Sequence, residues 1–120
     1  MYVLVAVLTD GEQVRRILRE LPLIDVRGAT VIESRGMTSL ADGDVPMFTN
    51  LTRVLGGGSS VTHYTLFSVI MTPETLENAK RLILDVVGNI EERETGIMFV
   101  IRLDEVYGLA PALRRNGEQG

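Results

Sequence analysis

The chain has 120 residues, which is enough for one domain with a real hydrophobic core and too few for two. It contains no cysteine, and this excludes disulfides, thiolate metal sites and a cysteine nucleophile. Its net charge of −4 argues against nucleic acid as a partner, because phosphate binding needs a concentrated basic face. No apolar run approaches the roughly 20 residues that cross a bilayer. The N-terminal run lacks the basic region of a signal peptide and predicts a first strand instead. Because the chain has no cysteine, we expect a cytoplasmic protein.

The first third of the chain predicts a strand, a helix and a second strand. Residues 2–8 are nearly all apolar and rich in valine, which is typical of a buried central strand. Asp10 has the position of a helix N-cap, with Gln13 at the spacing of a capping box. Apolar residues then recur on one helical face until Pro22, which should end the helix. Residues 28–34 predict the second strand.

The rest of the chain predicts a long loop, a strand, a helix and a last strand. Regular structure should resume near Tyr64, and residues 64–71 predict the third strand. Thr72 is a typical N-cap, Pro73 suits the first helical position, and Gly88 is a natural residue to follow the helix end. Residues 97–103 predict the fourth strand, followed by a polar tail over residues 104–120.

This order predicts an α+β fold, a ferredoxin-like βαββαβ sandwich that spans residues 1–120 as a single domain. A four-stranded antiparallel sheet would carry two helices on one face and a long loop, residues 38–62, between its second and third strands. Loops of this length in compact domains are usually functional or disordered. Several strands are apolar on both alternations, as Phe99 and Met98 illustrate. An exposed apolar sheet face usually marks an interface, so we expect a homo-oligomer.

Two stretches of sequence carry a resemblance to a known family. Residues 26–37 read VRGATVIESRGM and lead into the long loop, and residues 95–100 read TGIMFV and begin the last strand. With the order of the elements, these stretches make residues 2–103 similar to the PII-type signal-transduction proteins, as a divergent, PII-like member.

The resemblance implies a cytoplasmic homotrimer that binds an adenine nucleotide in the clefts between its subunits. Residues 38–62 would correspond to the T-loop, which docks onto a partner such as a membrane transporter or an enzyme. The implied ligand-binding positions are Arg35, Gly36, Met37 and Thr38 at the base of this loop, and Glu92, Arg93, Thr95, Gly96 and Ile97 on the opposing wall.

The sequence departs from the best-known members of that family at the phosphate-binding positions. Leu40 stands where those members have a glutamine that helps to bind Mg-ATP with 2-oxoglutarate, and the run from Glu94 to Ile97 offers no lysine. No tyrosine lies between Gly36 and His63, so uridylylation of the loop is not supported. With less positive charge, AMP, ADP or a cyclic nucleotide should bind better than Mg-ATP.

Other interpretations of the same residues remain open. Gly36 and Gly96 also suit ordinary turns, and the glycine-rich run at residues 56–60 fits a hinge better than a phosphate loop. His63 fits a surface or capping role better than a catalytic or metal-binding one, and without a nucleophile, base and acid together we expect no catalysis. The alternatives are a ferredoxin-like trimer that binds a metal or small metabolite, as in divalent-cation tolerance proteins, and a small enzyme that uses His63 with a nearby acid.

Overall fold

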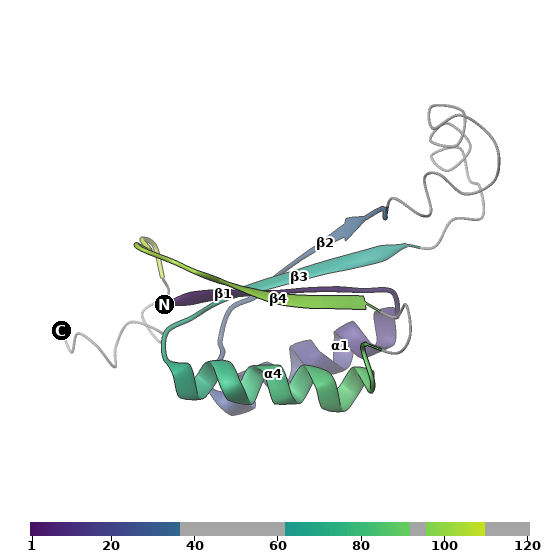
Figure 1. Cartoon of the computed structure of the whole chain (residues 1–120), viewed down its shortest axis with the longest axis horizontal. Coiled ribbons are helices and arrows are strands. Elements are labelled where there is room, and N and C mark those ends of the chain that lie inside the picture. The colour runs from purple at the N-terminus through teal and green to yellow at the C-terminus, as the bar shows by residue number, and fades with distance from the viewer. Residues whose placement is uncertain (37–61, 92–95, 110–120) are drawn as a thin grey trace.

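The computed structural model describes residues 1–36, 62–91 and 96–109, which form an open-faced α/β sandwich (Figure 1). The elements follow one another as predicted, so the βαββαβ fold is confirmed. In chain order they are β1 (Tyr2–Leu8), α1 (Gly11–Glu20), a short 3₁₀ helix η1 (Leu21–Ile24), β2 (Thr30–Ser34), β3 (His63–Ile70), α4 (Pro73–Val87) and β4 (Gly96–Arg102).

The four strands form one antiparallel sheet in the order β2-β3-β1-β4. The nearly continuous apolar strand β1 lies inside the sheet, where both of its edges are paired. Leu8, at its end, pairs with Tyr64 of β3 on one side and with Gly96 of β4 on the other. Strands β2 and β4 are therefore the two edges of the sheet.

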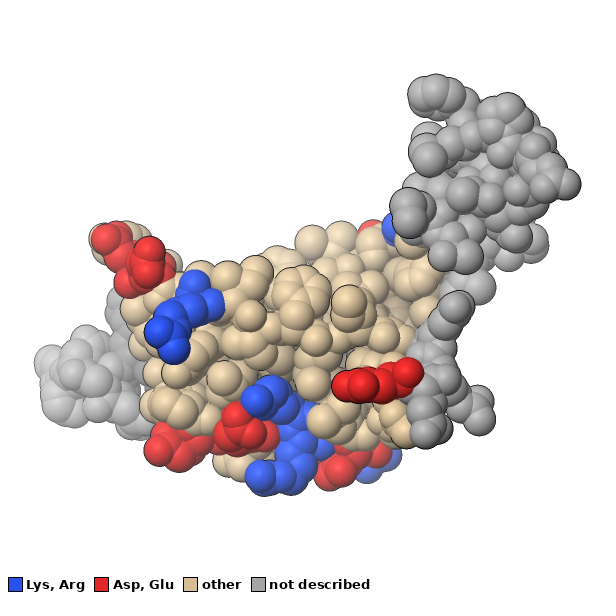
Figure 2. Space-filling model, viewed as in Figure 1, with Lys and Arg blue, Asp and Glu red and all other residues tan. Residues whose placement is uncertain are grey.

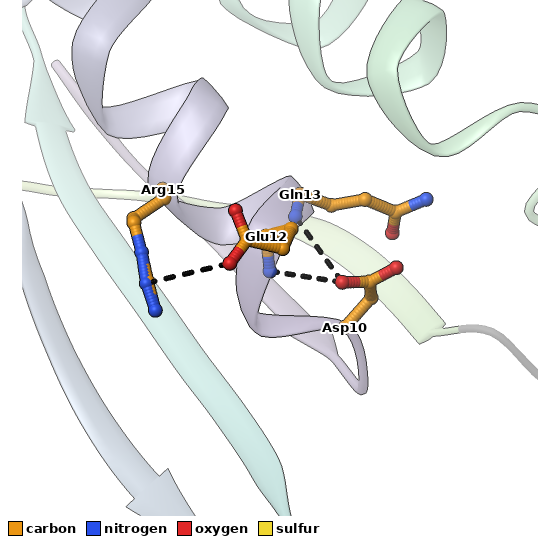
Figure 3. A network of polar contacts seen from close by, with 4 residues as sticks. All are labelled: Asp10, Glu12, Gln13 and Arg15. Carbon is orange, nitrogen blue, oxygen red and sulfur yellow. Dashed lines mark hydrogen bonds and ion pairs between the residues drawn. The ribbon is translucent and has the colours of Figure 1, made fainter.

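Helix α1 begins at the N-cap that the sequence predicts (Figure 3). The Asp10 carboxylate accepts hydrogen bonds from the backbone amides of Glu12 and Gln13, at 2.9 and 3.4 Å. The reciprocal half of the capping box is absent, because the Gln13 side chain instead donates to the carbonyl of Val86 at 3.5 Å. Gln13 thus ties α1 to the end of α4.

The chain after α1 differs from the prediction that Pro22 simply ends the helix. The α-helix ends at Glu20, and Pro22 then lies within η1, because its fixed φ suits the start of a helical turn. Asp25 ends η1 in the left-handed region, with φ of 75°. The amide of the buried Val26 donates to the carbonyl of Leu21 at 3.0 Å, which closes this turn.

Helix α4 has the ends that the sequence predicts. The Thr72 hydroxyl accepts a hydrogen bond from the Thr75 amide at 3.1 Å, and Pro73 occupies the first helical position. Gly88 follows the last turn with φ of 88°, a conformation that favours glycine, and its amide donates to the carbonyl of Leu84 at 2.8 Å.

Both helices cover the same face of the sheet, and the hydrophobic core lies between them and the strands (Figure 1). The core residues come from alternate strand positions and from one face of each helix: Leu4, Ala6, Leu8, Val14, Ile17, Leu21, Val26, Leu66, Ile70, Leu76, Ala79 and Ile83. Among the described residues, no helix is long and apolar enough to cross a membrane.

The opposite face of the sheet, which we call the open face, is apolar and has no helix over it. The strand register places nine apolar side chains on it: Val3, Val5, Val7, Ile32, Phe67, Val69, Ile97, Phe99 and Ile101. Phe99 is 43% exposed and Ile97 57%. Charged side chains gather mainly over the helices and at the ends of the sheet, and the middle of the strand region is uncharged (Figure 2).

The predicted strand boundaries shift by one or two residues: β3 ends at Ile70 and not at residue 71, and β4 spans Gly96–Arg102 and not residues 97–103. Two further shifts have a local reason. Strand β2 begins at Thr30 and not at residue 28, because the carbonyl of Gly28 accepts a hydrogen bond from the Ser68 hydroxyl in place of a partner in the sheet. Strand β3 begins at His63, one residue before the predicted start, because His63 still pairs with Ser34.

Candidate functional site

The two predicted walls of the ligand site lie at the same end of the sheet. Strand β2 finishes there at Ser34, opposite the first residue of β3, His63. Strand β1 finishes there at Leu8, and β4 starts there at Gly96. The antiparallel register therefore brings the residues that follow β2 and those that begin β4 to one end of the molecule (Figure 1).

At the β2 edge, a small polar cluster forms the base of the connection between β2 and β3. The Gly36 amide donates a hydrogen bond to Nδ1 of His63 at 3.1 Å. The Ser34 and Thr65 hydroxyls lie 3.0 Å apart and share a hydrogen bond. Arg35, between Ser34 and Gly36, is exposed. We call Ser34, Gly36, His63 and Thr65 the loop-base cluster.

Gly36 is glycine for a packing reason. A Cβ atom at this position would lie 2.8 Å from Cε1 and 3.1 Å from Nε2 of His63. The His63 ring therefore lies against the α-carbon of Gly36, and a side chain at this position would require the ring to move. The interpretation of His63 as a capping histidine agrees with this contact.

At the β4 edge, Gly96 is even more tightly confined. A Cβ atom there would lie 2.4 Å from the carbonyl oxygen of Val7 and 2.7 Å from Cδ2 of Leu8. The next residue, Ile97, lies on the open face and is 57% exposed. Gly96 thus has a structural reason to be glycine, and Ile97 offers the exposed apolar surface of this wall.

Within one chain the two walls are not close together. Gly36 follows one edge strand and Gly96 begins the other, and β3 and β1 lie between them. Three strand spacings of about 4.8 Å separate the edges by roughly 14 Å. The structure thus brings the two walls to one end of the sheet but not to one contact site.

The other predicted site residues lie outside the described residues. These are Met37, Thr38, Glu92, Arg93 and Thr95, together with most of the predicted T-loop. Glu91, just before the second group, is exposed, and its amide donates to the Asn89 side chain at 3.2 Å. Across the described part of the chain, no group of three or more His, Asp or Glu residues is arranged to hold a metal ion.

The described residues also form a pocket that the sequence patterns did not predict. It has a volume of about 330 Å³, is largely apolar and open to solvent, and lies at the start of β2 and the end of β3. Its lining comes from Gly28, Ala29, Thr30, Phe67, Ser68, Val69, Gly108 and Leu109. The small residues at positions 28 and 29 could have indicated a cavity from the sequence. The contribution of Gly108 and Leu109 to the pocket lining could not be predicted, because it depends on the path of the chain after β4.

Sequence comparison identifies no relative for this chain: no family model matches it, and no curated protein matches it. Comparison of structures shows the fold: the chain has the PII fold, a ferredoxin-like βαββαβ sandwich. Its described fold is similar to the crystal structure of Arabidopsis thaliana PII bound to citrate, with a TM-score of 0.58 and 17% sequence identity. The match covers 85% of this chain and 76% of the plant protein. At this identity the similarity establishes the fold, which the resemblance had predicted.

Proposed function

We propose that this protein is a PII-like regulator that binds an adenine nucleotide between its subunits and acts on a partner through residues 38–62. The observation that carries the proposal is the placement of the long β2–β3 connection on a PII fold, with a glycine held against His63 at its base. Signalling proteins of this type need no catalytic group, since the ligand changes the population of two states of a segment.

The position of the two walls favours a site shared between subunits. Gly36 and Gly96 lie near opposite edges of one sheet. A ligand that contacted both residues of the same chain would therefore have to reach across the two inner strands. In a closed ring of identical copies every heterologous contact joins two different surfaces, and in this proposal those surfaces are the β2 edge of one copy and the β4 edge of the next. The nucleotide would then contact Gly36 of one subunit and Ile97 of the next.

The charge of the described residues favours a ligand with few phosphates. Arg35 is the cation next to Gly36, whereas Glu91 is an exposed acid at the start of the opposing wall. A guanidinium can bind one or two phosphate oxygens well, but a triphosphate would need further cations. AMP, ADP or a cyclic nucleotide is therefore the proposed ligand.

A thermal-shift panel of AMP, ADP, Mg-ATP, cyclic AMP and cyclic di-AMP tests this function. A ligand at 100 times its dissociation constant should stabilise the native state by about 2.7 kcal/mol, which raises the melting temperature measurably. We expect a response to ADP or AMP that exceeds the response to Mg-ATP. A flat panel, with the trimer confirmed in solution, would contradict nucleotide binding.

A matched pair of arginine substitutions identifies the site. Arg35→Gln should weaken ADP binding about tenfold or more, because the charge next to Gly36 is lost. Arg27→Gln is the control, since Arg27 is exposed and forms its ion pair with Asp25 at 3.6 Å, on the connection before β2. Equal loss in both variants would indicate a general effect of net charge and would argue against a site at Gly36.

A further inference from the structure

The hydrogen bond between Gly36 and His63 fixes the chemical state of the imidazole. The Gly36 amide is the donor, so Nδ1 of His63 must present a lone pair. A neutral imidazole can do this when its proton is on Nε2, whereas an imidazolium carries protons on both nitrogens and accepts nothing. This bond therefore exists in the neutral state of His63 and is lost when the ring is protonated.

The same bond continues the pairing of two strands beyond the end of the sheet. The last β2–β3 pair joins Ser34 to His63, and the Gly36 amide then bonds the His63 side chain instead of a backbone carbonyl. In this position the ring lies where a Cβ atom of residue 36 would be, so the ring is packed against the backbone of Gly36 as well as hydrogen-bonded to it. Loss of the bond would free the first residue of the β2–β3 connection from its anchor.

The groups around the His63 ring offer it no carboxylate partner within the described residues. Its neighbours on the open face, Ser34 and Thr65, are uncharged. Glu33 pairs with Tyr64 and so lies on the opposite face, where the helices pack. Asp10, which follows β1 at this end, accepts hydrogen bonds from the first turn of α1. Arg35 is the charged residue adjacent to Gly36 along the chain.

We propose that His63 is a positioning residue that holds Gly36 in place in its neutral state and releases it on protonation. Acidification would then loosen the base of the β2–β3 connection. The further consequence, that nucleotide affinity falls as the pH falls, rests on the proposed function, because it assumes that Gly36 contacts the ligand. Histidine is the side chain suited to such a change between pH 5 and 8.

Nuclear magnetic resonance of the full-length protein tests the inference without any ligand. In the wild type, the nitrogen shifts of His63 should identify the Nε2–H tautomer at pH 8. The protection factor of the Gly36 amide against hydrogen exchange should fall about tenfold as the ring becomes protonated, as expected for the loss of one hydrogen bond. An Nδ1–H tautomer, or a protection factor that does not change with pH, would overturn the proposal.

Two substitutions at His63 separate the hydrogen bond from the titration. His63→Asn places an amide oxygen on Cγ, where Nδ1 is attached, so it should keep the Gly36 amide protected and remove the dependence on pH. His63→Ala should reduce the protection about tenfold at every pH. If the alanine variant keeps full protection, His63 does not position Gly36.

ADP binding by calorimetry then tests the link to function. The wild type should lose affinity between pH 8 and 5.5 by about tenfold more than His63→Asn, and the asparagine variant controls for the protonation of the phosphates of ADP itself. An equal loss in both proteins would overturn the link. If AMP, ADP and the cyclic nucleotides all fail to bind the wild type at any pH, the proposed function is wrong, and the hydrogen-exchange result still decides the role of His63.

Discussion

Three glycines near the two edges of the sheet show how differently single residues of one type are constrained. Gly96 is confined by the backbone of β1, which cannot move without disturbing the centre of the sheet. Gly36 is confined by the His63 ring, a side chain that can rotate away at the cost of its hydrogen bond. A Cβ atom at Gly28 would meet no atom of the described residues within 4 Å. Substitution by alanine should therefore have different effects at Gly96 and at Gly28.

Gly96→Ala should destabilise the fold strongly. Its Cβ would overlap the Val7 carbonyl oxygen at 2.4 Å, and overpacking of this kind costs about 1–3 kcal/mol. Gly28→Ala is the control, and it should be neutral or stabilise by about 0.4–1 kcal/mol through the unfolded state. Urea denaturation of both variants measures the difference, and an unchanged midpoint for Gly96→Ala would show that β1 and β4 are further apart at this position than the structure indicates.

A second single-residue prediction concerns the buried hydroxyl of Ser68. This side chain is 3% exposed and donates its hydrogen bond to the carbonyl of Gly28, which anchors the chain before β2. Ser68→Ala should lower the free energy of unfolding by about 1 kcal/mol.

The matched control for that prediction is Ser34→Ala, in the loop-base cluster. Its hydroxyl pairs with Thr65 at 3.0 Å in a partly exposed position, where water can replace the lost partner. We expect a smaller loss of stability than for Ser68→Ala in thermal unfolding. The reverse order would mean that the Gly28 carbonyl is satisfied without Ser68.

At the scale of whole elements, the helices are defined by signals within a few residues of their ends. Asp10 and Thr72 cap α1 and α4, and Gly88 follows α4 in a conformation suited to glycine. Such local signals explain why the helix ends and strands could be predicted to within about two residues. The exceptions depend on residues that are far apart in sequence. The Gln13 side chain, for example, donates to the carbonyl of Val86, 73 residues away.

The cap of α4 gives a prediction at this scale. Thr72→Ala should destabilise the protein by about 1 kcal/mol, because the Thr75 amide loses its hydroxyl acceptor at 3.1 Å. Thr72→Ser keeps that acceptor and should restore most of the stability. Chemical denaturation of the three proteins checks this, and a serine variant as unstable as the alanine variant would show that the methyl group, and not the cap, matters.

The candidate site was less predictable than the elements because it depends on pairing between them. The Gly36–His63 bond joins residues 27 positions apart, and its geometry follows from the β2–β3 register. The resemblance predicted Gly36 and Gly96 on two walls of one ligand site. Neither stretch of sequence that carries the resemblance encodes the sheet order, which places these walls at opposite edges of the sheet. The pocket near Thr30 is lined in part by Gly108, and no local sequence pattern indicates that the chain returns to this place after β4.

At the scale of the whole molecule, the two faces of the sheet have opposite characters. The helix side has charged residues in pairs such as Arg16–Glu20 at 2.9 Å and Lys80–Glu77 at 2.7 Å, which suit contact with water. The described strand positions on the open face include no Asp, Glu, Lys or Arg. An apolar face of this extent favours burial against other copies of the chain, which is consistent with the expected homo-oligomer.

Phe99→Glu tests whether the open face forms the subunit interface. Phe99 is 43% exposed in the single chain and pairs with Val5 on the open face, so a carboxylate there should be tolerated by an isolated chain. In a trimer packed through the sheets, the same carboxylate would lose its hydration without a partner, which costs several kcal/mol. Light scattering should then report about three chains of 13.2 kDa for the wild type and one for Phe99→Glu.

Leu23→Glu provides the matched control for the interface. Leu23 is 81% exposed and belongs to η1, on the helix side, so the same change from an apolar to an acidic side chain should leave the trimer intact. Because the proposed nucleotide site needs the β2 edge of one copy and the β4 edge of another, Phe99→Glu should also abolish the thermal response to ADP, while Leu23→Glu retains it. Full ADP binding by a monomeric Phe99→Glu protein would place the ligand within one chain, where the pocket near Thr30 is one candidate.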